Sequence, residues 1–393
     1  MKRYTLWIIA LILILKSFDL YAARPFDSYS LRPMGMGNAF TAVADDYNAI
    51  YFNPAGIASL DRFDIDVPLN LMISQDTANL LTEMSTISNN LEASEDGSKI
   101  TPQFKEAVDK LLKLTDDTLG GRADLSVGWV LPNVKLGGTY FGLGLGAYAQ
   151  LGTKVYIQPV GLPIQKPFNI LNDELIVQTG CDYVVSGSLA MMVPFKEFSG
   201  NSSLGVTIKA LNRVYLDNEK EPIVFSSLLR EDLNVEKYFD LSKAKSKSGV
   251  GLDLGWMYEY NKMIRLGLMV KDISNSLKVD PNLRIGIAVK PMQSFALGKK
   301  IPPVDATFAL DLDNLNNKVR KDKKFLDKLH LGTELKLAPF KNRALVLSLR
   351  AGNNQGYLTL GTGLKILWLL NADYAYFGDP VADWHSLSLR FSI

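Results

Sequence analysis

A strict alternation of apolar and polar residues constrains this chain more than any other feature. Residues 63–73 read FDIDVPLNLMI, with the apolar residues at odd positions and the polar ones between them. Successive side chains of a β-strand point to opposite faces, so this spacing predicts a strand with one apolar face. The candidate strands with this pattern lie at 63–73, 125–131, 141–147, 175–193, 203–215, 250–258, 264–270, 283–290, 303–313, 328–337, 344–351, 357–366, 368–377 and 384–393.

Two fold classes have strands of this kind: an exported β-sandwich and a membrane barrel. The candidate strands run to roughly 10 to 12 residues, longer than the typical 5 to 6 of soluble sheets and close to the 9 to 11 that cross a bilayer. Long connections near 74–121, 153–174 and 216–247 alternate with short turns, as in outer-membrane barrels. We therefore expect an all-β fold, a transmembrane antiparallel β-barrel of about fourteen strands, with the soluble sandwich as the alternative.

Charged residues on the strands should face the lumen of such a barrel, because a basic side chain placed in lipid costs about 2 to 4 kcal/mol near the midplane. The residues concerned are Asp64, Asp66, Asp253, Arg265, Lys271 and Arg350. An even number of strands also returns both chain ends to one side, which we expect to be the periplasm.

The first 22 residues have the pattern of an export signal. Lys2 and Arg3 precede an apolar run, LWIIALILIL at 6–15, which is too short to span a bilayer as a helix. The small residues Ala22 and Ala23 follow it, and this order predicts a signal peptide over 1–22.

Composition and motifs exclude several function classes. The net charge is +2, from 43 basic and 41 acidic residues, which gives no electrostatic case for nucleic acid. Cys181 is the single cysteine, so no internal disulfide forms. No G-x-S-x-G elbow and no cluster with metal-ligand spacing is present. We expect that the protein is not an enzyme and that it binds no cofactor or metal. The alternative is a lipase in which His385 acts as the base for Ser386 or Ser388.

Residues 35–58, GMGNAFTAVADDYNAIYFNPAGIA, form a compact segment ahead of the first strand. Phe40, Val43, Ala44 and Tyr47 have helical spacing, which predicts a short amphipathic helix over 38–47. Asn53 followed by Pro54 predicts an N-cap and the first residue of one more helical turn. Such a segment is too short to fold alone, and we expect it to lie inside the barrel.

This segment resembles the N-terminal hatch of the FadL-type outer-membrane barrels, which include fatty acid and hydrocarbon transporters and PorV-like relatives. Ala42 and Ala44 match the helix of that hatch, and the strands KLHLGTELKL, ALVLSLRAG, YLTLGTGLKI and NADYAYFGD resemble closing strands of PorV-like members. The resemblance implies a hatch over 23–61 inside a barrel over 62–393, with a helical outer loop at about 74–121. The hatch residues that it implies are Gly35, Gly37, Asp45, Asp46, Asn53, Pro54, Ala55 and Gly56.

The resemblance also implies a function in the outer membrane: passive transport of long-chain fatty acids or other hydrophobic small molecules, in contact with outer-membrane lipid. The alternative is a PorV-like docking or assembly platform for secreted or surface proteins.

The outer loop offers one candidate ligand groove. Residues 103–114, QFKEAVDKLLKL, place an apolar stripe beside lysines at helical spacing. The groove residues would be Phe104, Lys105, Val108, Leu111 and Leu112. The other interpretation is a helix that packs on the barrel rim.

Overall fold

The computed structural model describes residues 30–60, 63–75, 119–158, 174–193, 200–217, 223–224, 244–275, 279–291, 304–318, 324–338, 344–367, 369–378 and 383–392. The predicted signal peptide and the five groove residues of the outer loop lie outside these ranges. In the described part, no helix is long and apolar enough to cross a membrane.

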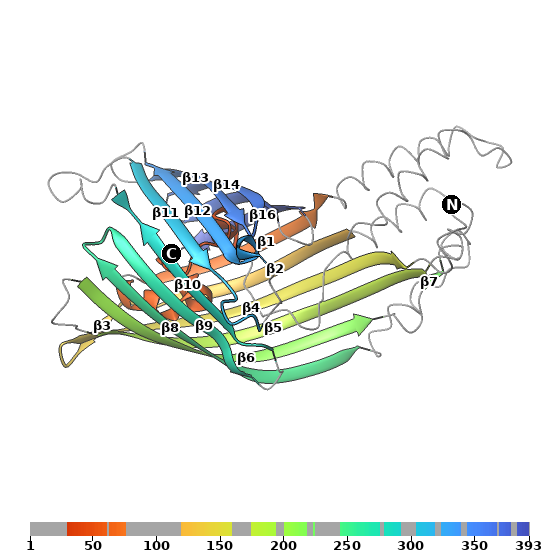
Figure 1. The fold of residues 1–393 in the computed structure, drawn as a ribbon, viewed down its shortest axis with the longest axis horizontal. Coiled ribbons are helices and arrows are strands. Elements are labelled where there is room, and N and C mark those ends of the chain that lie inside the picture. Colours follow the sequence, from red (N-terminus) through yellow and green to blue (C-terminus); the bar gives the residue numbers. More distant parts are fainter. Residues whose placement is uncertain are drawn as a thin grey trace.

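The described strands form one antiparallel sheet (Figure 1). The strands are β1 (Asp64–Ser74), β2 (Leu119–Val130), β3 (Val134–Leu136), β4 (Thr139–Gln158), β5 (Glu174–Val193), β6 (Gly200–Asp217), β7 (Ile223–Val224), β8 (Lys245–Tyr260), β9 (Ile264–Asn275), β10 (Asn282–Val289), β11 (Val304–Leu312), β12 (Leu329–Leu337), β13 (Leu345–Asn354), β14 (Tyr357–Ile366), β15 (Leu370–Gly378) and β16 (Asp383–Ser392).

The sheet closes on itself. Each long strand pairs with the next along the chain, β1 pairs with β16, and the pairing of β4 with β5 completes the ring. The short strands β3 and β7 pair only with β4 and β5. The remaining fourteen strands make a closed barrel, so the predicted fold class is confirmed. Each of the fourteen predicted strand positions falls on one barrel strand.

The barrel wall is much taller on one side than on the other. Strands β4, β5, β6 and β8 have 20, 20, 18 and 16 residues, whereas β10 has 8 and β15 has 9. About 9 to 11 residues suffice to cross a bilayer. The tall wall, which we define as β4, β5, β6 and β8, is therefore long enough to extend beyond the membrane layer. Figure 1 shows these strands projecting past the shorter ones.

The alternation places the apolar side chains outside and the polar ones inside. On β1, Leu69 and Leu71 are 46% and 52% exposed, whereas Asn70 between them is buried. Asp66, Asp253 and Arg350 are buried, as expected for charges that face the lumen. A closed barrel with an apolar exterior and a polar interior is a transmembrane β-barrel.

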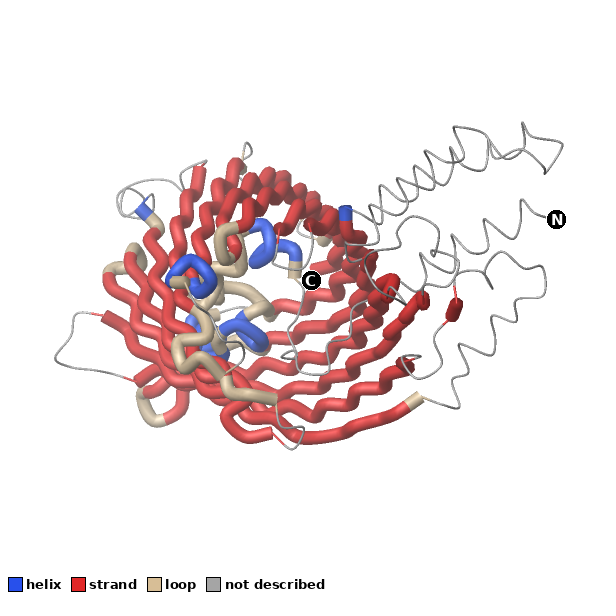
Figure 2. Tube along the Cα trace, turned by 45° about the vertical axis from the view of Figure 1, so that its right-hand side comes forward, coloured by secondary structure: helices blue, strands red, loops and turns tan. Residues whose placement is uncertain are grey.

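Residues 30–60 lie inside the barrel (Figure 2). This segment, the hatch, contains α2 (Leu31–Gly35), α3 (Ala49–Phe52) and the 3-10 helix η1 (Pro54–Ser59). The hatch starts beside Met72, Phe377 and Trp384. These residues lie near the rim of the barrel at which β1 ends and the long connection after β1 begins. The barrel strands themselves start and end at the opposite rim, because Asp66 of β1 pairs with Ser392 of β16.

The predicted helix over 38–47 is wrong: these residues form turns and irregular backbone, and none of them is helical. Gly37 and Asn38 have φ angles of 60° and 61°, a left-handed conformation that ends α2. The amides of Phe40 and Thr41 then donate to the Asp311 carboxylate of β11 instead of to helical carbonyls. The apolar residues with helical spacing are buried because the lumen encloses the segment, not because one helix face is buried.

The lipid-facing surface gives the first prediction. Leu69→Arg, at the middle of β1 on the apolar face, should destabilise the barrel by about 2–4 kcal/mol. The measurement is urea unfolding in phospholipid bilayers. Ser246→Arg is the matched control, since Ser246 is exposed at the start of β8 on the tall wall. Equal losses for the two variants would contradict the assigned membrane layer.

Candidate functional site

The Asn53-Pro54 turn joins the hatch to the barrel, and its predicted capping is confirmed. The Asn53 side chain accepts a hydrogen bond from Ala55 N at 3.2 Å, and Pro54 is the first residue of η1. The Asn53 amide also donates to Thr41 O at 2.9 Å and to Trp256 O of β8 at 3.1 Å. One buried side chain therefore connects two parts of the hatch and the wall.

Glycines allow the hatch backbone to approach the wall this closely. A Cβ at Gly255 of β8 would overlap Asn53 Oδ1, and one at Gly205 of β6 would overlap the peptide between Pro54 and Ala55. Gly56 in the hatch lies directly against Ala44 O. Side chains of any size at these positions would push the turn away from the wall.

Arg32 is the centre of a buried ion-pair network on the opposite side of the lumen. Its guanidinium contacts Asp45, Asp46 and Glu334 of β12, each at 2.7 Å. Lys290 pairs with Asp45 at 2.6 Å. Arg350 of β13 extends the network to Glu334 at 2.9 Å and to Asp373 of β15 at 2.7 Å.

The charges in this network compensate one another. Burial raises the pKa of Asp45 and Asp46, but Arg32 together with the other cations around them, Lys290 beside Asp45 and Arg390 near Asp46, holds the pKa of both carboxyls below the ordinary value. Both side chains are therefore ionised at neutral pH. Their role here is to hold the hatch, since Asp45 and Asp46 bind Arg32 of the same segment.

Charged wall residues also bind the hatch backbone between Gly37 and Val43. Asp311 accepts from Phe40 N and Thr41 N, both at 2.9 Å. His330 contacts Gly37 O at 2.8 Å, and Arg265 donates to Val43 O at 3.0 Å. Residues 31–46, the ionic half of the hatch, are thus held mainly by the strands from β9 to β15.

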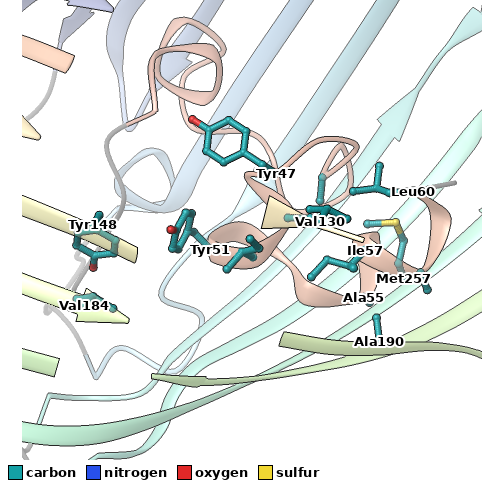
Figure 3. Close-up of a cluster of buried hydrophobic side chains, with 14 of the residues drawn as sticks. Tyr47, Tyr51, Ala55, Ile57, Leu60, Val130, Tyr148, Val184, Ala190 and Met257 are labelled. Carbon is teal, nitrogen blue, oxygen red and sulfur yellow. The ribbon is translucent and has the colours of Figure 1, made fainter. Parts of the chain in front are cut away.

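The rest of the hatch binds differently. Residues 48–60, the neutral half, pack Ile50, Tyr51 and Ile57 into an apolar cluster with wall residues (Figure 3). The Tyr51 ring points at that of Tyr148 on β4, with centroids 5.6 Å apart. The wall residues of this cluster are Val130, Tyr148, Val184, Ala190, Leu211 and Met257.

Neutral side chains of the wall hydrogen-bond the backbone of the neutral half. Ser203 donates to Ala55 O at 2.9 Å, and Asn133 donates to Ala58 O at 2.6 Å. Thr207 is 3.4 Å from Ile50 O. The ionic half adds the ion pairs of Arg32 to apolar packing of its own, such as that of Phe40.

The eight hatch residues named from sequence all lie in the lumen. Gly35 packs against Gly361 of β14, and Gly37 lies against the backbone of Leu331 and Asn353. Sequence reasoning missed Arg32 and its partner Glu334. Glu334 is an acid at an inward position of a period-two strand, and that signal could have identified it. No group of three or more potential metal ligands occurs among the described residues.

Fold and hatch together define the architecture: a fourteen-stranded barrel wall around an N-terminal hatch. Solved structures of similar fold include two hydrocarbon channels. The toluene transporter TbuX of Ralstonia pickettii aligns with a TM-score of 0.50 and 9% identity, over 93% of this chain and 97% of that one. A TodX mutant described as a monoaromatic hydrocarbon channel aligns with a TM-score of 0.48 and 10% identity, over 93% and 98%.

The family model described as "F plasmid transfer operon, TraF, protein" matches residues 50–298. The chain belongs to this family. No curated protein matches it.

The ion-pair network gives the second prediction. Arg32→Ala leaves three buried carboxylates without their shared cation, and breaking a buried pair in this way costs about 3–5 kcal/mol. The strands do not depend on Arg32, so the barrel should still assemble and remain heat-modifiable on gels. Leak of small hydrophilic antibiotics should rise several-fold. Lys135→Ala, at an exposed position of β3, is the control; unchanged leak in Arg32→Ala would mean that the network does not keep the lumen closed.

The Asn53-Pro54 turn gives the third prediction. Pro54→Leu removes the preset φ that starts η1, and the turn should leave Gly205 and Gly255. We expect an intact barrel with raised antibiotic leak, while Lys135→Ala, at an exposed position of β3, should behave as wild type. Failure of Pro54→Leu to assemble would make the turn a folding element and not a gate.

Proposed function

We propose that the protein is an outer-membrane channel for hydrophobic small molecules, with the hatch as its gate. The observation that carries this proposal is the filled lumen. The interior of an eight-stranded barrel holds only side chains, whereas barrels of sixteen to eighteen strands leave an aqueous channel. A fourteen-stranded barrel lies near the wider end of this range, so its wall encloses a passage. Here the N-terminal segment of the same chain occupies that passage, and its contacts with the wall are non-covalent. The similarity of fold to a toluene transporter supports the proposal.

The apolar cluster around the neutral half suits an uncharged or weakly polar solute. Long-chain fatty acids and monoaromatic hydrocarbons are the substrate classes we propose, with outer-membrane lipid as the surrounding solvent. Oleate and toluene are probes that separate them, because only oleate carries a carboxylate that requires a cationic partner.

We infer that the protein is not an enzyme. His385 contacts Tyr374 and Gln75 at 2.8 and 2.6 Å, whereas Ser386 is buried on the opposite face of β16. Adjacent strand residues point to opposite faces, so His385 cannot activate Ser386. Ser388 lies on the same face of β16 as Ser386, so the same argument applies to it.

Uptake tests the channel, and this is the fourth prediction. Cells that carry the gene should accumulate labelled toluene or oleate several-fold faster than cells that lack it. A strain that expresses an equal amount of the Leu69→Arg variant controls for effects of barrel protein in the membrane. Equal uptake of both probes with and without the gene would contradict the proposal.

Two observations favour a docking platform as the second candidate. The family description names a plasmid transfer operon, and the tall wall presents exposed lysines such as Lys245 and Lys247 beyond the membrane layer. In that role the barrel would bind secreted or surface proteins. Cross-linking followed by purification separates the two functions: a stoichiometric protein partner together with no solute uptake supports docking.

A further inference from the structure

We propose that the outer end of β8, residues 245–249, accepts an extended segment of a partner protein as an added strand, and that this segment carries acidic side chains at alternate positions. The inference goes beyond solute transport, because it concerns the border of the tall wall and not the lumen. It also names the kind of partner that a docking platform of this shape would bind.

The outer end of β8 is paired on one side only. On the side of β6, each residue of this stretch has a partner, starting with Tyr215 opposite Lys245. On the side of β9, pairing starts only at Gly251, which lies opposite Asn275. Within the described part of the chain, residues 245–249 therefore form a strand edge, and the sheet leaves the N–H and C=O groups on its outer side for another strand.

This edge lies in water and not in lipid. Along β8 the outward side chains Val250 and Leu254 are apolar, whereas Ser246 and Ser248 at the outer end are polar and exposed. An open sheet edge is not tolerated in the hydrocarbon layer, because nothing there can satisfy its backbone groups. The change from apolar to polar outward residues therefore marks the end of the membrane layer on this strand, and a partner in the aqueous phase can reach the edge.

The edge is also preformed. Pairing with β6 holds residues 245–249 extended, and β6 pairs in turn with β5 as far as Asp217. An extended segment can therefore bind without rearrangement of the wall, and the cost of ordering falls on the partner alone. In strand addition, main-chain hydrogen bonds provide affinity and the side chains beside them provide specificity.

Two lysines determine which segment fits. Lys245 and Lys247 share one face of the edge, and each ammonium group lies 5.7 Å from the centre of the Tyr215 ring. Their neighbour Arg213 is neutralised by Asp182 at 2.6 Å. Within the described residues, no carboxylate pairs with either lysine. Since residues two apart on a strand share one face, acidic side chains at alternate positions of an added strand lie opposite both charges.

The same lysines disfavour the simplest other occupant, a second copy of this chain. Two such edges that pair with each other bring lysine close to lysine, and like charges opposite one another across strands are unfavourable. Lysines on an edge strand also hinder pairing with neutral segments. The edge therefore binds through its backbone and selects an acidic segment through its charge.

Synthetic peptides test the proposal on the full-length barrel in phosphatidylcholine nanodiscs. The probe is the labelled peptide TEVEVET, and TKVKVKT is its matched control. Fluorescence anisotropy should show about tenfold tighter binding of the acidic peptide. Lys245→Glu with Lys247→Glu should reverse that preference, whereas Lys135→Glu with Lys262→Glu, exposed at the opposite rim, should keep it. An unchanged preference in the first double variant would overturn the inference.

Backbone methylation of the probe separates strand addition from attraction between charges alone. On an added strand, alternate N–H groups point to the edge and the others point away from it. Two versions of the acidic peptide, N-methylated at odd or at even positions, carry the same charge. One should bind about tenfold more weakly and the other like the parent peptide.

Equal binding of the two methylated versions, or a wild-type barrel that is dimeric without peptide, would overturn the inference. Because these measurements use purified protein, their outcome does not depend on whether cells take up toluene. Failure of the transport proposal and failure of strand addition are therefore distinguishable.

Discussion

The lipid around the barrel is the constraint on which the rest of the structure depends. Because the outer face must be apolar, strict alternation sends the polar and charged side chains inward. A segment that fills the lumen therefore meets an inner face unlike the interior of a soluble protein. The hatch is held there by Arg32 with Glu334, by Asp311, and by hydroxyls such as that of Ser203. Its backbone groups are satisfied by short turns within the hatch and by side chains of the wall, and not by long helices.

The same constraint explains the glycines on the strands. Glycine weakens an ordinary strand because it has no side chain to pack, so the run GLGLG at 142–146 is a poor strand in isolation. In the barrel, Leu143 and Leu145 face lipid while the glycines between them receive Ile57, Ile50 and Tyr51 of the hatch. Their cost to the strand is offset by the packing that they permit.

The sequence predicted most of the barrel and part of the hatch, for physical reasons that differ. Period-two alternation is a local signal repeated along the wall, so the strands and their faces could be read directly. The Asn53 cap is also local, and it was predicted correctly. Arg32 was missed because its partner Glu334 lies 302 residues away, and no local pattern indicates that distance. The prediction of a helix over 38–47 was wrong because apolar residues at helical spacing also occur in a segment that is buried on all sides.

The division of the hatch into two halves follows from the uneven wall. The short strands β10 to β13 present the charged partners of residues 31–46, such as Asp311 and Glu334, whereas the contacts of residues 48–60 with the tall wall are made by glycines, apolar side chains and hydroxyls. Ion pairs buried in a low dielectric are directional and fail when one partner moves, so they hold the ionic half in one position. Apolar contacts are non-directional and can be exchanged for others of similar area. The hatch is therefore fixed in position by ion pairs on one side of the lumen and packed by non-directional contacts on the other.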